Sequence, residues 1–184
     1  PVYAMPLLLE ILTAHAPWRD LVAQGHIAPR PLHAGAPVPL GGGVTATPEL
    51  VPHRAEMGET VAFRIRGPER AVLYLPDIDG WQAALEGVDP PSLMARLSDV
   101  DVAYLDGTFG DATELPRRDR GTIPHPTIRE TLAELDGQPQ AARRKVRFTH
   151  LNHSNPALDP SGDLVAAVRA AGCDVADDGE CVPL

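Results

Sequence analysis

The sequence predicts an α/β fold in which helices alternate with the strands of a layered sheet. Short apolar runs of strand character, at residues 71–75, 100–105 and 146–149, are separated by segments whose apolar residues recur at helical spacing. Several of these strands also run directly into histidine or aspartate, as at Thr149-His150. Open α/β sheets carry their chemistry at such strand ends.

The first third of the chain predicts two helices followed by β structure. Residues 7–15 and 18–24 have helical apolar spacing, and Pro17 separates them. Residues 27–50 are rich in proline and glycine, which favours short β segments around a glycine turn at residues 41–43.

The strand predicted at residues 60–66 alternates between apolar and polar side chains, so Val61, Phe63 and Ile65 are expected to face inward. The runs at 71–75 and 100–105 are nearly continuous in apolar residues, which is typical of buried strands. The other expected elements are helices at 91–97, 126–135 and 161–171 and short strands at 146–149 and 174–176. Ser161 or Asp159 is expected to cap the last helix.

Length and composition favour one domain, residues 1–184, and exclude several classes of partner. The net charge of −9 disfavours nucleic acid. No apolar run approaches the roughly 20 residues that span a bilayer, and no signal peptide is recognisable. Cys173 and Cys181 form no metal-binding or redox pair motif, which favours reduced thiols and a cytoplasmic location. The sequence leaves the oligomeric state, including a homo-oligomer, open.

Histidine and aspartate gather at the ends of the predicted strands. His53 follows a β segment, Asp77 and Asp106 follow buried strands, and His150 follows a fourth strand. Imidazole and carboxylate are the ligands of zinc, iron and manganese. Asp77 is the strongest candidate, since burying a lone carboxylate is costly unless it is paired or coordinated. For each residue alone, a surface turn is the alternative interpretation.

Three segments of the chain also carry a family resemblance. They are Leu105-Asp106-Gly107-Thr108-Phe109, Ile123-Pro124-His125-Pro126 and Thr149-His150-Leu151-Asn152-His153-Ser154-Asn155-Pro156. In this order they resemble the C-terminal part of the coenzyme PQQ synthesis protein B family, within the metallo-β-lactamase fold superfamily. The resemblance implies an αββα sandwich, in which two sheets are faced by helices and metal lies at one sheet edge.

The resemblance assigns roles to particular residues. It implies that the metal ligands are His53, Asp77 and His150. It places on the active-site side, as candidate catalytic residues, Asp106, His125 and His153. Thr122 stands where the family often has histidine.

Two family features are not among these 184 residues: an upstream HxxxDH-type metal motif and a cysteine-rich zinc site. Pro1-Val2-Tyr3-Ala4 looks like the family segment just after that motif. We therefore expect a metallo-β-lactamase-like fold that is incomplete at its N-terminus.

The activity that the resemblance implies is oxidative. An iron-dependent oxygenase would hydroxylate the tyrosine ring of a small, peptide-derived PQQ precursor. Two alternatives stay open. One is a hydrolase or phosphodiesterase with zinc or manganese, which His150-x-x-His153 favours slightly; the other is a metal-free binding or carrier protein. We expect His53, Asp77 and His150 to converge, because strand ends of one sheet meet at one edge.

Overall fold

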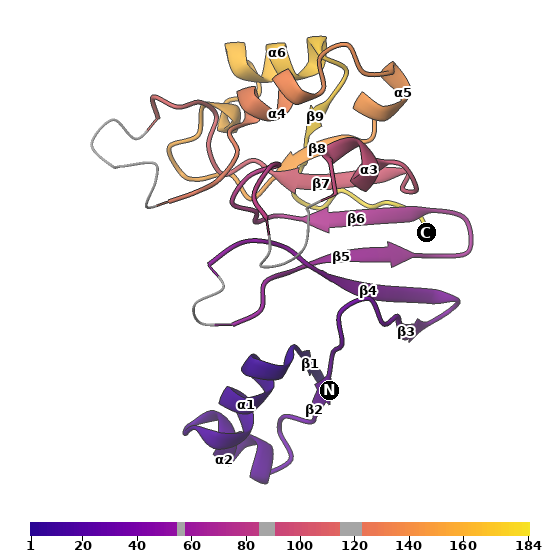
Figure 1. The fold of residues 1–184 in the computed structure, drawn as a ribbon, viewed down its shortest axis with the longest axis vertical. Coiled ribbons are helices and arrows are strands. Elements are labelled where there is room, and N and C mark those ends of the chain that lie inside the picture. Colours follow the sequence, from indigo (N-terminus) through magenta and orange to yellow (C-terminus); the bar gives the residue numbers. More distant parts are fainter. Residues whose placement is uncertain (55–57, 85–90, 115–122) are drawn as a thin grey trace.

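A computed structural model of the chain describes residues 1–54, 58–84, 91–114 and 123–184. Its main feature is one seven-stranded sheet with the strand order β3-β4-β5-β6-β7-β8-β9, and β1 and β2 form a separate parallel pair (Figure 1). Thr122 lies outside the described residues.

Apart from the short helix α5 and the 3-10 helix η2, the strands and helices follow the order expected from the sequence. The strands are β1 Val2–Ala4, β2 Pro29–Pro31, β3 Val38–Gly41, β4 Val44–Leu50, β5 Val61–Arg66, β6 Ala71–Leu75, β7 Val102–Asp106, β8 Val146–Thr149 and β9 Asp174–Val175. The helices are α1 Pro6–Ala14, α2 Trp18–Ala23, α3 Leu93–Leu97, α4 Ile128–Glu134, α5 Gln140–Arg143 and α6 Asp163–Ala170, with a 3-10 helix η2 at Pro156–Leu158. No helix within these described ranges is long and apolar enough to cross a membrane.

Strand direction brings four loops to one edge of the sheet. Strands β3 to β6 pair antiparallel, whereas β6 to β9 pair parallel. Strand β4 therefore points the same way as β6, with β5 reversed between them. The carboxyl ends of β4, β6, β7 and β8 consequently lie at the same edge, and the segment that follows each strand begins there.

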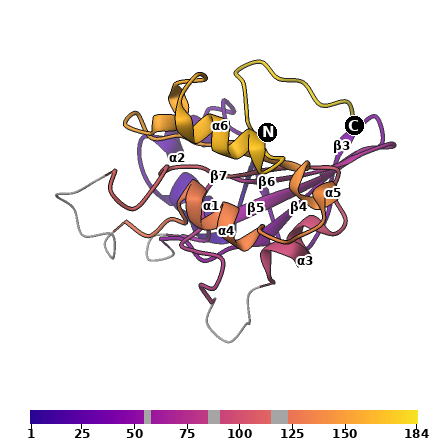
Figure 2. The same ribbon diagram turned by 90° about the horizontal axis from the view of Figure 1, so that it is seen from above.

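The hydrophobic core lies between the sheet and helices α3, α4 and α6. Leu73, Leu105 and Phe148 of the sheet are fully buried, and Ile128 of α4 and Val168 of α6 pack in the same cluster. Viewed from above, these helices flank the strands (Figure 2). Large branched and aromatic side chains on alternate strand positions thus give the sheet one helix-covered face.

The expectation that Val61, Phe63 and Ile65 of β5 face the helix-covered core is wrong. Ala62 is the fully buried residue of this strand, whereas Val61, Phe63 and Ile65 are only half-buried. Ile65 pairs with Val72 of β6, and both lie on the sheet face opposite the core helices. Both faces of this sheet carry apolar side chains, so alternation identifies two faces without telling which one meets the helices.

The second face of the sheet, defined here by Val61, Phe63, Ile65, Val72, Tyr74 and Tyr104, is partly covered by the last residues of the chain. Glu180 accepts a hydrogen bond from Arg147 at 2.6 Å. A cavity of about 370 Å³ lies between residues 176–184 and the sheet. The described residues thus form one large sheet with one helical layer. The second large sheet of the expected sandwich is not among them, since their other two strands form only the β1–β2 pair.

Candidate metal centre

The sheet edge described above brings the predicted site residues together. His53 lies in the loop after β4, Asp77 follows β6, Asp106 ends β7 and His150 follows β8. Registers Leu75↔Leu105 and Asp106↔Thr149 keep the ends of the three parallel strands level. Residues far apart in the sequence therefore share one rim.

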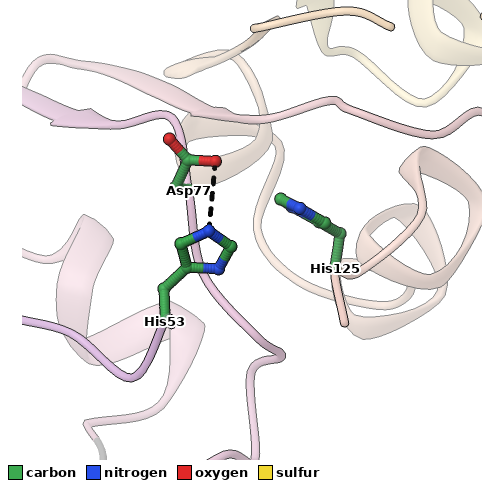
Figure 3. A group of neighbouring side chains, drawn as sticks. All are labelled: His53, Asp77 and His125. Atoms are coloured by element: carbon green, nitrogen blue, oxygen red, sulfur yellow. Dashed lines mark ion pairs between the residues drawn. The ribbon is translucent and has the colours of Figure 1, made fainter. Parts of the chain in front are cut away.

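Three side chains at this rim can together hold a metal ion. One ligand atom from each of His53, Asp77 and His125 lies within 4.8 Å of the other two (Figure 3). His53 Nε2 is 3.6 Å from Asp77 Oδ1, and the rings of His53 and His125 are 4.9 Å apart between centroids. All three side chains are partly buried. Two imidazoles and one carboxylate form a common ligand set for zinc and iron.

Each histidine of this cluster has a carboxylate at its other ring nitrogen. His53 Nδ1 lies 3.0 Å from Asp79 Oδ1, and His125 Nδ1 lies 2.7 Å from Asp106 Oδ2. An Nδ1–H that is donated to a carboxylate leaves the Nε2 lone pair available for a metal. Histidine ligands in proteins are usually oriented in this way.

Asp106 is fully buried, and three donors satisfy its carboxylate. The backbone N–H groups of Ile78 and Thr108 donate to it at 3.0 and 2.9 Å, and His125 is its third partner. These hydrogen bonds offset the cost of burying the charge. Gly107 lets β7 approach β8, since a Cβ there would lie 2.8 Å from the carbonyl oxygen of Thr149.

Two opposing effects act on the pKa of His125. Burial of the ring lowers this pKa, whereas the hydrogen bond to Asp106 and the charges of Asp106, Asp77 and Asp79 raise it. The raising effects win, and the pKa of His125 lies above its ordinary value. The site therefore favours positive charge at this position, whether that charge is a proton or a metal ion.

His150 lies beside the cluster without being one of its three donors. Its Nδ1 is 3.5 Å from Asp77 Oδ1 and 3.0 Å from Thr108 Oγ1, and about half of its side chain (49%) is exposed. Its φ of 60° is unusual for a residue other than glycine. The expected meeting of His53, Asp77 and His150 is thus found in part, with His125 completing the group instead.

The remaining predicted residue, His153, is exposed on the turn after His150 and does not join the cluster. Sequence reasoning missed the roles of Asp79 and Thr108, which contact His53 and His150. A signal for Asp79 was present, because a second aspartate follows Asp77 directly after a buried strand. Nothing in the local pattern of Thr108 indicates its contact.

One cavity borders the cluster and a second borders the neighbouring His150. One of about 390 Å³ is bordered by Asp79, Trp81 and His125. The other, of about 530 Å³, is bordered by His150 and by apolar residues that include Leu158 and Val165. Volumes of this size accept small organic ligands, so the candidate metal centre lies beside space for a substrate.

Comparison with known proteins supports the resemblance seen in the sequence. The chain is 26% identical over 200 residues to coenzyme PQQ synthesis protein B of Xanthomonas axonopodis pv. citri, covering 97% of this chain and 62% of that protein. It is 29% identical over 155 residues to the protein of the same name from Pseudomonas putida, covering 76% of this chain and 46% of that protein. The chain thus spans less than two thirds of the length of these relatives.

Solved structures share the fold. Zinc-bound PqqB from Methylobacterium extorquens superimposes with a TM-score of 0.72 at 22% identity, covering 99% of this chain and 64% of that one. A diphosphatase from the PhnP family gives a TM-score of 0.61 at 20% identity, covering 100% of this chain and 58% of the other. The expected metallo-β-lactamase-like α/β fold is therefore confirmed. Residues 1–168 match the family described as "Beta-lactamase superfamily domain", and the chain belongs to this family.

Proposed function

We propose that this chain is the metal-binding part of an enzyme that resembles coenzyme PQQ synthesis protein B and acts on a small or peptide-derived substrate. The observation that carries the proposal is the group of His53, Asp77 and His125, in which each histidine is backed by a carboxylate. A histidine pair on a surface does not need such support. Ligand histidines usually have it.

The residues present fit a divalent metal, and the donor set suits iron or zinc, with manganese as a further option. A metal held there with open positions supplies either oxygen activation or a polarised water. Asp79 and Asp106 keep the two imidazoles in place, and Asp77 offers its Oδ1 between His53 and His150.

The oxygenase is the first candidate reaction. Its support is the similarity to coenzyme PQQ synthesis protein B along 97% of the chain. In this proposal the metal is iron, and the substrate is a tyrosine-derived PQQ precursor whose ring is hydroxylated. The cavity next to His150 has room for such a ring, and its lining combines apolar side chains such as Leu158 and Val165 with the charged Arg169.

Hydrolysis, including that of phosphodiesters, is the second candidate. The Asp106–His125 pair favours it, because a histidine backed by a buried carboxylate can hold a proton at Nε2 and deliver it to a leaving group. The same atom is the one that a metal would use. The two reactions therefore assign different tasks to His125.

Metal loading and turnover distinguish these candidates. The protein is loaded separately with Fe²⁺, Zn²⁺ and Mn²⁺, and bound metal is measured per chain. Iron-dependent oxygen uptake with a tyrosine-containing peptide supports the oxygenase, whereas zinc- or manganese-dependent cleavage of bis-p-nitrophenyl phosphate supports the hydrolase. His53→Ala should abolish stoichiometric loading, and His26→Ala, at an exposed histidine, should not. A wild-type protein that binds none of these metals would instead be a metal-free binding or carrier protein.

A further inference from the structure

Glu114 joins the loop after β7 to the loop after β8. One carboxylate oxygen, Oε2, accepts a hydrogen bond from the backbone N–H of Gly110 at 2.7 Å. The other, Oε1, accepts from Ser154 Oγ at 2.6 Å and lies 3.5 Å from Asn152 Nδ2. The side chain is partly buried. Both oxygens are therefore engaged, each with a different loop.

The contacts continue from Glu114 to the candidate metal centre. Asn152 Nδ2 donates to Ser154 Oγ at 2.6 Å, and the backbone N–H of Asn152 donates to the carbonyl oxygen of Thr108 at 3.0 Å. Thr108 Oγ1 in turn lies 3.0 Å from His150 Nδ1. His150, at the start of the second loop, thus contacts Thr108 of the first loop, and Glu114 helps to hold the two loops together.

The backbone of His150 needs such support. Its φ of 60° lies in the left-handed region, which is unfavourable for a residue with a Cβ. Conformations of this kind persist only where the surroundings over-determine them. Hydrogen bonds to a charged carboxylate are stronger than neutral ones and suit this task.

We propose that Glu114 is a positioning residue that holds His150 beside Asp77 by fixing the loop of residues 150–155 against the loop of residues 107–114. Glu114 acts on His150 through Ser154, Asn152 and Thr108 and is not itself proposed to contact the substrate or a metal. The expected effect of Glu114 on metal binding rests on the proposed function. Its effect on the position of His150 does not depend on that function.

Two variants test whether Glu114 positions His150 or only stabilises its own loop. Ser154→Ala removes the hydrogen bond from Ser154 to Glu114 and leaves the contact of Glu114 with Gly110. The bonds that Asn152 and Asn155 make to the loop after β7 also stay in place. Glu114→Gln keeps the size of the side chain but removes the negative charge, so the hydrogen bonds from Gly110 and Ser154 lose the charged acceptor that strengthens them. Glu10→Gln, at an exposed position on α1, removes the same charge elsewhere and is the matched control.

The first measurement uses metal-free protein with ¹⁵N-labelled histidine. We expect Ser154→Ala and Glu114→Gln to shift or broaden the ring signals of His150, while those of His53 and His125 stay in place. Glu10→Gln should change none of them. Unchanged His150 signals in both test variants would overturn the proposal. Ser154→Ala keeps every charge, so it provides the test even where Glu114→Gln fails to fold.

The second measurement is Zn²⁺ affinity by titration calorimetry. We expect both test variants to bind Zn²⁺ a few-fold more weakly, because a displaced His150 no longer lies beside the ligand Asp77. Full affinity in both variants would show that His150 placement does not matter for the metal, against the proposal. If wild-type protein binds no Zn²⁺ while the His150 signals still respond, the proposed function fails and the positioning role of Glu114 stands.

Discussion

At the scale of single residues, the candidate metal centre depends on carboxylates that orient histidines. Asp106 is the clearest case, because it is fully buried and accepts from two backbone N–H groups as well as contacting His125. Such a residue has little freedom to move. The imidazole that it holds is therefore set in advance for a ligand.

Asp106→Asn should weaken metal binding by roughly 10-fold or more, as is typical when the partner of a ligand histidine is lost. The amide places a donor where the carboxylate accepts, so one of its three partners loses its acceptor. Zn²⁺ titration measures the effect, with Asp136→Asn on the exposed loop after α4 as the control. Equal affinity in the two variants would reduce Asp106 to a residue that only shapes the turn.

The two cysteines should differ sharply in reactivity. Burial raises the pKa of Cys173 to about 11, so this thiol stays protonated near neutral pH, whereas Cys181 is exposed. Because the thiolate is the nucleophile, we expect a thiol reagent at pH 8 to label Cys181 alone in folded protein and both thiols in denaturant. Cys181→Ser should leave the folded chain unlabelled. Rapid labelling of that variant would show that the Cys173 environment opens readily.

At the scale of elements, the start of α4 fixes the backbone next to His125. Thr127 Oγ1 accepts from the N–H of Glu130 at 3.1 Å, and Glu130 Oε2 accepts from the N–H of Thr127 at 2.7 Å. This reciprocal capping box satisfies N–H groups that the helix itself cannot pair. Since His125 lies two residues upstream, the cap also limits where its ring can sit.

Thr127→Ala should lower the free energy of unfolding by about 1 kcal/mol, the usual loss for a helix N-cap. Urea denaturation followed by circular dichroism measures it. Thr13→Ala, near the exposed end of α1, is the comparison and should change stability by less than about 0.5 kcal/mol. A loss at Thr127 no larger than at Thr13 would show that the capping box contributes little to the fold.

The elements also show how far sequence patterns reach. The apolar run predicted β6 at its observed bounds, Ala71–Leu75. A nearly continuous run of apolar residues is by itself a sufficient signal of a strand that is buried on both faces. The expected cap of α6 is wrong: Gly162 occupies the cap position, and Asp159 bonds Ser161 instead. Helix α5 was not foreseen, since its four residues are too few to show a period.

The site residues at the ends of strands could be predicted from the sequence, whereas the position of a residue in a long loop could not. Asp77, Asp106 and His150 follow strands of one sheet, so their shared edge follows from strand direction. His125 reaches the same edge only because the long connection from β7 to α4 returns there, and no periodicity encodes that return. The contact between Asp106 and His125 therefore had to come from the structure.

At the scale of the whole molecule, the two faces of the large sheet differ. Helices α3, α4 and α6 bury one face, whereas the second face is only partly covered, by residues 176–184. Tyr74 on that face is 43% exposed although it lies on a central strand. Exposed apolar surface of this kind favours association, and the αββα resemblance implies that another sheet packs there.

We therefore expect the 184-residue chain, produced by itself, to self-associate through the second face of its sheet. Tyr74→Glu should shift the chain toward monomer, because a carboxylate there would have to be desolvated on association. Tyr3→Glu is the matched control, since Tyr3 is 42% exposed and lies on the separate β1–β2 pair. Size-exclusion chromatography with light scattering over a range of concentrations gives the mass. A wild-type chain that stays monomeric and soluble throughout would show that residues 176–184 cover this face well enough to make the sheet self-sufficient.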